Sequence, residues 1–95
     1  MPIEDPRYHF TAVIAYGAPS NSGVYALWQD RELIYIGRAA SIRQLLIDHL
    51  EKRDIREATH YSWELSLRPL EREAELLEQF RKRHGHLPRC NAEAA

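Results

Sequence analysis

The amino-acid sequence predicts a single mixed α/β domain with the element order strand, strand, helix, strand, helix. The chain has 95 residues, 44% of them hydrophobic, which is enough for one hydrophobic core and too little for two domains. Residues 24–28 and 33–36 are runs of β-branched and aromatic side chains, which are typical of strands. Residues 41–53 and 69–84 instead carry apolar side chains at helical spacing, so both element types are expected around one core.

The first two strands are expected to pair as a hairpin. Val24–Trp28 and Leu33–Ile36 are separated by the short polar segment Gln29–Glu32, which suits a tight turn. Before them, Tyr16–Gly23 is rich in Gly, Pro, Ser and Asn and is expected to be a loop. Alternating apolar residues in Tyr8–Tyr16 leave room for an additional N-terminal edge strand.

Two helices and a third strand follow. Ser41 is a plausible N-cap for a helix to about Arg53, and His60–Leu67 alternates strictly, as in a strand with one covered side. Pro69 suits the first turn of a second helix, with Gly85 as the residue that follows its end. The expected buried faces are Ile42, Leu45, Leu46 and Leu50 on the first helix, and Leu70, Leu76, Leu77 and Phe80 on the second.

Composition excludes several classes of protein. The formal net charge is −1, with 13 Lys and Arg against 14 Asp and Glu, which argues against bulk electrostatic coating of nucleic acid. No uncharged apolar run is long enough to span a bilayer and no secretory signal follows Met1, so we expect a cytoplasmic protein without a membrane partner. Cys90 is the only cysteine and can form neither an internal disulfide nor a cysteine-rich zinc site.

Four polar residues stand on faces that are otherwise apolar. Glu73 interrupts the stripe of the second helix and His49 lies on the inner face of the first, while Tyr25 and Tyr35 share a face of the hairpin. Each of these residues can also have a purely structural role. Glu73 can lie at the exposed edge of the apolar stripe, His49 can pack in the core, and the two tyrosine rings can pack against each other across the strands. If they converge, they suit phosphodiester hydrolysis, in which a phenol or imidazole handles the proton of water and a carboxylate holds a divalent metal.

The charges are unevenly distributed along the chain. The stretch from Arg81 to Arg89 holds four Lys or Arg residues and no acid. Such a stretch can bind phosphates, or it can simply complement the dipole at a helix C-terminus.

The order and spacing of several motifs resemble those of the GIY-YIG nuclease family. Gly23–Tyr25 (GVY) is followed about ten residues later by Tyr35–Gly37 (YIG), and then by His49, Glu73–Leu77 (EAELL) and Pro88–Asn91 (PRCN). Either tripeptide alone would be a weak match, but together they cover most of the chain between residues 23 and 91.

The resemblance implies a small α/β domain with a three-stranded antiparallel sheet flanked by helices. On this basis residues 1–22 are an N-terminal extension that includes the edge strand and loop, residues 23–91 are the GIY-YIG-like domain, and residues 92–95 are a tail. The implied activity is a metal-dependent nuclease that uses one divalent ion, Mg²⁺ or Mn²⁺. Its partner is nucleic acid, with DNA as the expected substrate.

The resemblance also implies roles for individual residues. Tyr25 and His49 would act on the attacking water, Tyr35 would support them, and Glu73 would be the metal ligand. Arg38 and Asn91 match further family positions, and other cations are candidates by their charge alone. The expected nucleic-acid-binding residues are Arg38, Arg43, Arg81, Lys82, Arg83, Arg89 and Asn91.

One position departs from the family pattern. The family's transition-state arginine is expected ten residues after Tyr35, where this chain has Leu45. Arg43 lies two residues away, about 200° around the helix, so it cannot take that place without a change of register. Loss of a preorganised cation typically slows phosphoryl transfer on the order of 10²–10³-fold. Either another arginine, such as Arg38, Arg43 or Arg89, enters the site, or the chain is a catalytically weakened nucleic-acid-binding or protein-interaction module.

Overall fold

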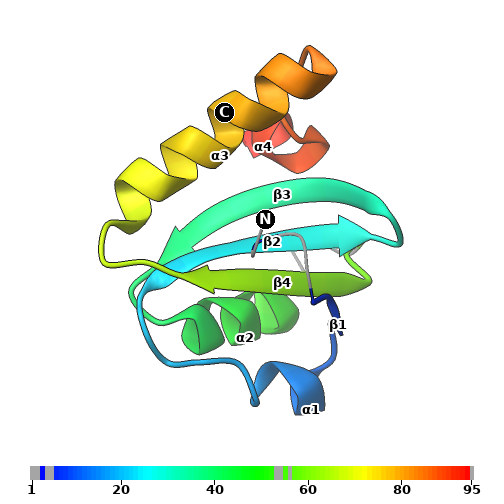
Figure 1. Ribbon diagram of the computed structural model, residues 1–95. Helices are drawn as coiled ribbons and strands as arrows, with labels where there is room; N and C mark the ends of the chain where they lie inside the picture. Colours follow the sequence, from blue (N-terminus) through cyan, green and yellow to red (C-terminus); the bar gives the residue numbers. More distant parts are fainter. Residues whose placement is uncertain (1–2, 4–5, 53–54, 56, 95) are drawn as a thin grey trace.

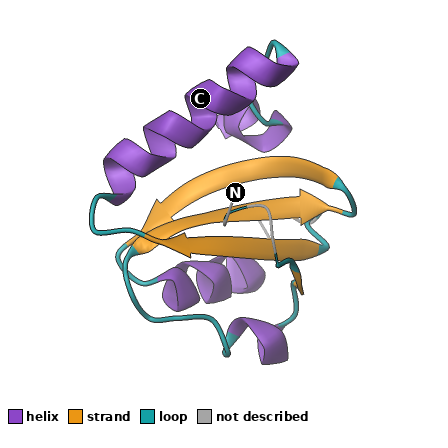
Figure 2. Ribbon diagram, viewed as in Figure 1, coloured by secondary structure: helices purple, strands orange, loops and turns teal. Residues whose placement is uncertain are grey.

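A four-stranded antiparallel sheet lies between two layers of helices in the computed structural model (Figures 1 and 2). The structure describes residues 3, 6–52, 55 and 57–94. The elements are β1 (Tyr8–His9), α1 (Ala12–Ala15), β2 (Gly23–Gln29), β3 (Glu32–Ala39), α2 (Ile42–Lys52), β4 (His60–Leu65), α3 (Pro69–His84) and α4 (Arg89–Ala94). The strand order is β1-β4-β2-β3, so β3 forms one edge of the sheet. Figure 1 shows α3 on one face of the sheet, and α2 and α1 on the other.

The predicted hairpin is confirmed, with a tighter turn than expected. Strands β2 and β3 pair from Gly23 opposite Ala39 to Gln29 opposite Glu32. Asp30 is the first residue of the turn between them and has a φ of 54°. Asp tolerates this left-handed conformation better than most residues because its short polar side chain can hydrogen-bond locally.

Strand β4 is covered on both faces, which corrects the prediction of a strand with one covered side. It pairs with β2 on the side away from β3. Ser62, on the side predicted to be polar, is fully buried and accepts a hydrogen bond from Trp28 Nε1 at 2.9 Å. The strand also ends at Leu65 rather than Leu67, and Leu67 is 99% exposed. The second covered face was missed because it depends on a contact from a distant segment, in which the Ser62 hydroxyl donates to the Ile3 carbonyl oxygen, whereas local alternation reports only one apolar side.

The N-terminal edge strand is much shorter than expected. Only Tyr8–His9 pairs with β4, and Ala12–Ala15 forms a short helix instead of continuing the strand. Thr11 accounts for this change, because its side chain accepts from the Ile14 N–H at 3.4 Å as a helix N-cap.

The two predicted helices are confirmed, together with the start of α2 and both ends of α3. The Ser41 hydroxyl accepts from the Gln44 N–H at 3.3 Å at the start of α2, and the expected last residue, Arg53, lies outside the described residues. Helix α3 begins at Pro69 and ends at His84, and Gly85 follows as its cap with a φ of 80°. The short helix α4 was not predicted. No helix in the described part of the chain is long and apolar enough to cross a membrane.

Two hydrophobic clusters hold the layers together. The cluster on the α2 face of the sheet contains Ala15, Ala18, Tyr25, Leu27, Ile34, Ala39, Ile42, Leu46, Tyr61 and Cys90. The cluster on the α3 face contains Ile3, Val24, Ala26, Trp28, Ile36 and Leu76. Ile3, Ala15 and Ala18, which precede the hairpin in the chain, therefore contribute buried side chains to these clusters. In the predicted stripe of α3, Leu76 is buried but Leu70 is 56% exposed, because it lies at the start of the helix.

Candidate active site

Three of the residues predicted to be catalytic meet on the α2 face of the sheet. The Tyr25 hydroxyl is hydrogen-bonded to His49 Nε2 at 2.7 Å. The Tyr35 ring lies beside them, with its centroid 6.1 Å from that of Tyr25 and 5.7 Å from that of His49. Residues Leu27 and Tyr35 are directly opposite each other in the hairpin, so Tyr25 and Tyr35 are diagonal neighbours on one face. The hairpin register and helix α2 together build this cluster.

The pairing of Tyr25 with His49 creates a proton-handling dyad. Tyr25 is 1% exposed and His49 is partly exposed, so solvent reaches the pair from the imidazole side. A neutral imidazole has one donor and one acceptor nitrogen, and a phenol can both donate and accept. The two groups can therefore exchange a proton along their hydrogen bond and pass on one taken from a water molecule.

Gly37 is required where the Tyr25 ring crosses β3. The two residues pair directly across the hairpin. A Cβ atom on Gly37 would lie 2.6 Å from both Cζ and the hydroxyl oxygen of Tyr25. No real Cβ sits that close to a neighbouring atom, and the buried ring has little room to move. The glycine of the YIG tripeptide therefore permits the position of the tyrosine of the GVY tripeptide.

Glu73 forms an ion pair on the opposite side of β3. Arg38 Nη1 donates to Glu73 Oε1 at 2.7 Å, and the two side chains are 50% and 17% exposed. Glu73 comes from α3 and Arg38 directly follows Gly37 in β3. The dyad and the ion pair thus approach consecutive residues of the edge strand from opposite faces.

The chemistry around Glu73 fits a hydrated divalent cation, the metal that the resemblance implies. Among the described residues, no three His, Cys, Asp or Glu side chains are grouped so that they could share a metal ion. Mg²⁺, however, usually keeps several waters and is bound by only one or two carboxylates. Glu73 Oε1 accepts from Arg38, which leaves Oε2 available as a ligand on a partly exposed carboxylate.

Leu45 occupies the position of the family's arginine and packs as an apolar residue. It lies one helical turn before His49 and contacts the hydrophobic cluster on the α2 face. Arg43 points elsewhere, because its Nε donates to the Ala18 carbonyl oxygen at 2.8 Å. This hydrogen bond supports the loop before β2, and the expected role of Arg43 in binding nucleic acid stays a prediction.

Arg89 is also engaged within the protein. Its guanidinium donates to Gln29 Oε1 at 2.7 Å and lies 3.3 Å from Glu57 and 3.7 Å from Glu32. These contacts tie α4 to the hairpin turn. Of the three arginines considered as replacements for the missing cation, Arg38 is the one next to the Tyr25–Gly37 contact.

Asn91 positions the edge strand, and its predicted contact with nucleic acid stays a prediction. Its Oδ1 accepts from the Ile36 N–H at 2.8 Å, and its Nδ2 donates to the Ile36 carbonyl oxygen at 2.9 Å. The amide group thus satisfies outward-facing backbone groups of β3, as a neighbouring strand would. Both polar ends of the side chain are used within the protein.

The basic last turn of α3 carries Arg81, Lys82, Arg83 and His84. Arg81 pairs with Glu78 at 2.5 Å, and this contact lowers the pKa of Glu78 through the hydrogen bond and the positive charge. Lys82 and Arg83 are exposed in the same last turn. Both interpretations of this stretch, phosphate binding and complementing the helix dipole, remain open predictions.

One anchoring contact was not anticipated from the sequence. Arg72 donates to both oxygens of Glu64, at 2.6 and 3.1 Å, across α3 and β4. These hydrogen bonds raise the pKa of Arg72. The contact fixes the helix turn that carries Glu73. No local pattern could reveal it, because the two residues belong to different elements.

The architecture matches that of a GIY-YIG endonuclease domain, although no family model and no curated protein matches the chain. The GIY-YIG N-terminal endonuclease domain of UvrC from Thermotoga maritima, as a point mutant bound to its catalytic divalent cation, is 24% identical with a TM-score of 0.63. That match covers 73% of this chain and 87% of that domain. The same domain bound to magnesium is 25% identical with a TM-score of 0.62, covering 70% of this chain and 85% of that one. The chain therefore has the GIY-YIG fold, as its sequence motifs predict.

Proposed function

We propose that the protein is a metal-dependent nuclease that hydrolyses phosphodiester bonds of nucleic acid, with DNA as the expected substrate. The observation that carries the proposal is the hydrogen bond of 2.7 Å between the Tyr25 hydroxyl and His49 Nε2, beside Tyr35. A proton-handling pair at this place has a clear use in a fold that the solved UvrC domain combines with a catalytic divalent cation. The similarity in fold supports phosphodiester hydrolysis as the class of reaction. The individual chemical steps are argued from the residues of this chain.

The dyad would act on the attacking water. With its hydroxyl hydrogen directed to His49, the Tyr25 oxygen can accept a hydrogen bond from water and orient it. As the water attacks, the proton passes to the phenol oxygen and the phenolic proton passes to the imidazole. Tyr35 holds both rings in place by packing against them.

Glu73 and Arg38 would manage the charge on the phosphate. Glu73 Oε2 would hold the divalent ion, which when bound supplies Lewis-acid polarisation of a phosphoryl oxygen. Arg38 keeps the carboxylate oriented through Oε1, and its half-exposed guanidinium can contact a phosphate oxygen. In this arrangement Arg38 supplies the cation that Leu45 cannot.

A cleavage assay with a matched pair of variants tests the proposal. The purified protein is incubated with single- and double-stranded DNA and RNA in Mg²⁺, Mn²⁺ or EDTA. We expect cleavage that needs the metal and disappears in Glu73→Gln, because the amide keeps the shape of the side chain and loses its charge. Glu75→Gln, on the same helix with a side chain 60% exposed, should cut as wild type does. Circular dichroism verifies that both variants are folded. Cleavage by Glu73→Gln at the wild-type rate would contradict the proposal.

A second candidate function is binding without efficient cutting. The observation that favours it is the packing of Leu45 in the hydrophobic cluster, where the family has its transition-state arginine. A wild-type protein that shifts nucleic acid in a gel but cuts none of the four substrates in either metal would support this alternative. A protein that neither binds nor cuts nucleic acid would leave protein interaction as the function of the fold.

A further inference from the structure

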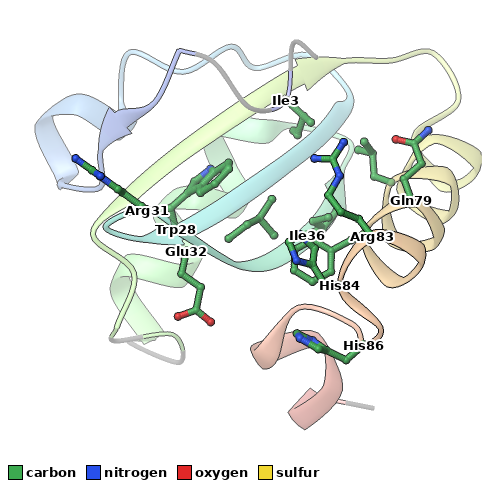
Figure 3. Close-up of a pocket in the computed structure, with 12 residues that line it drawn as sticks. Ile3, Trp28, Arg31, Glu32, Ile36, Gln79, Arg83, His84 and His86 are labelled. Carbon is green, nitrogen blue, oxygen red and sulfur yellow. The ribbon is translucent and has the colours of Figure 1, made fainter.

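A cavity of about 320 Å³ lies on the face of the sheet opposite the dyad. It is formed between the C-terminal half of α3 and the hairpin of β2 and β3 (Figure 3). Its apolar surface comes from Trp28, Leu33 and Ile36 on the sheet and from Leu76 and Phe80 on α3. This volume is at the lower end of the range of pockets that take small ligands, which is roughly 300–1,000 Å³. A compact ligand therefore fits better than an extended chain.

The rim of the cavity is rich in cationic and titratable groups. Arg31, Arg83, His84 and His86 line it, and Glu32 is the one acidic residue among its described lining residues. Figure 3 shows the guanidinium of Arg83 reaching from α3 towards Ile3, across the cavity from Glu32. The Glu32 carboxylate also lies 3.7 Å from Arg89 outside the cavity, which reduces its repulsion of an anion. The rim is thus complementary to a ligand with negative charge.

Aromatic rings gather where the apolar floor meets this rim. The Phe80 and His84 ring centroids are 4.2 Å apart, and that of His86 lies 5.9 Å from Phe80. Trp28 lines the same cavity and is held in place, because its Nε1 donates to Ser62 and Arg7 stacks on its ring at 4.0 Å. Planar side chains around an apolar floor suit a planar heterocycle, because stacking on aromatic rings stabilises a base without requiring a particular sequence.

We infer that this cavity binds one nucleotide of a nucleic acid, with its base on the apolar floor and its phosphate at the rim formed by Arg83, His84 and His86. The inference rests on the proposed function, which makes nucleic acid the source of the ligand. The preference for a base and a phosphate is argued from the residues that line the cavity. It places a second contact on the α3 face, separated by the sheet from the dyad. A strand held there would pass the edge at β3, where Arg38 and Gly37 lie.

Nuclear magnetic resonance of the two tryptophan indole N–H groups tests the inference directly. Trp28 lines the cavity, while Trp63 packs on the opposite face with the α2-face cluster and serves as an internal reference. Titration with a deoxynucleoside 5′-monophosphate should shift the Trp28 signal to saturation and leave that of Trp63 in place. Deoxyribose 5-phosphate and inorganic phosphate, which lack the base, should bind at least tenfold more weakly.

Variants on α3 provide the matched comparison. His84→Ala and Phe80→Ala should each weaken nucleotide binding at least fivefold, whereas Glu75→Gln, on the same helix but outside the cavity lining, should have no effect. His84 is exposed at the helix end, so its variant tests the site even where Phe80→Ala lowers stability. Equal affinity for inorganic phosphate and nucleotide, or an unchanged Trp28 signal, would overturn the inference.

The outcome is distinguishable from that of the proposed function. Saturable nucleotide binding at Trp28 in a protein that does not cut nucleic acid would support the cavity and contradict the nuclease. Metal-dependent cleavage without any shift at Trp28 would support the nuclease and overturn the nucleotide site.

Discussion

At the scale of single residues, the chemistry of this protein depends on a buried hydroxyl. A phenol that is 1% exposed, as Tyr25 is, must find a hydrogen-bond partner inside the protein, and His49 provides it. A second buried tyrosine, Tyr61, instead has a backbone carbonyl oxygen as its hydrogen-bond partner. Tyr61 donates to the Ile14 carbonyl oxygen, and burial raises the pKa of its phenol. Tyr25 therefore differs from Tyr61 in having a partner that can take a proton.

The residue that departs from the family pattern gives the sharpest prediction at this scale. We expect Leu45→Arg to raise the cleavage rate by tenfold or more, equivalent to about 1.4 kcal/mol of barrier, because it restores a cation one helical turn before His49. Leu45 is only partly buried, so a long side chain can carry its charge to solvent, at a cost of about 1–3 kcal/mol in stability. Initial cleavage rates and urea denaturation measure the two effects.

Leu45→Met is the control for packing, because it keeps the volume and adds no charge. Its cleavage rate should match that of wild type. A folded Leu45→Arg variant that cuts more slowly than an active wild-type protein would show that another arginine already supplies the cation. Arg38, which is paired with Glu73, would then be the residue to replace next.

At the scale of elements, the edge strand β3 connects the parts of the candidate site. It carries Tyr35, Gly37 and Arg38, it faces α2 and α3 on its two sides, and its outward edge is closed by Asn91. An uncovered edge strand is prone to fraying and to pairing with other chains. The short helix α4 thus stabilises the strand on which the site is built.

Replacement of Asn91 tests this role. Asn91→Ala removes both hydrogen bonds to Ile36 and leaves half-buried backbone groups without their partner, so we expect a loss of about 1–3 kcal/mol in the free energy of unfolding. Hydrogen exchange at the Ile36 amide should accelerate in the same variant. Ala92→Ser, at an exposed position of the same helix, is the control and should change neither measurement. If exchange at Ile36 stayed as slow as in wild type, Asn91 would be free for another role.

At the scale of the whole molecule, local charge matters more than the net charge of −1. Much of the charge is neutralised internally, as in the pairs Arg38–Glu73, Arg72–Glu64 and Arg81–Glu78. The exposed cations at the end of α3 lie near the rim of the nucleotide cavity. Phosphate contacts are therefore expected on this side of the protein.

The salt dependence of nucleic-acid binding checks this expectation. Each phosphate contact should contribute about −0.7 to −0.9 to the slope of log affinity against log salt. The double variant Lys82→Glu and Arg83→Glu should lower both affinity and slope, while Lys52→Glu, an exposed change on α2, should have a smaller effect. Fluorescence anisotropy with a labelled oligonucleotide measures the slope. An affinity independent of salt would show that these cations do not contact phosphates and only complement the helix dipole.

The sequence by itself determined the elements whose cause is local. A glycine after α3, a serine before α2 and runs of β-branched residues act within a few positions of themselves, and the structure confirms the helices and hairpin they predict. The motif order was also sufficient to identify the GIY-YIG fold, which the solved UvrC domain confirms. Strand β1 was overestimated because alternation in Tyr8–Tyr16 outweighed the weaker signal of Thr11 as a helix cap.

Only the tertiary structure decided what the polar side chains contact. Glu73 was predictable as a carboxylate in an apolar stripe, but its partner Arg38 comes from another element. Asn91 and Arg43, which stay predicted nucleic-acid-binding residues, also have polar atoms bonded to the backbone of Ile36 and Ala18, and no local pattern could reveal these contacts. The physical reason is that a hydrogen bond or ion pair between distant segments depends on how the layers pack, whereas sequence patterns record only which neighbours share a face.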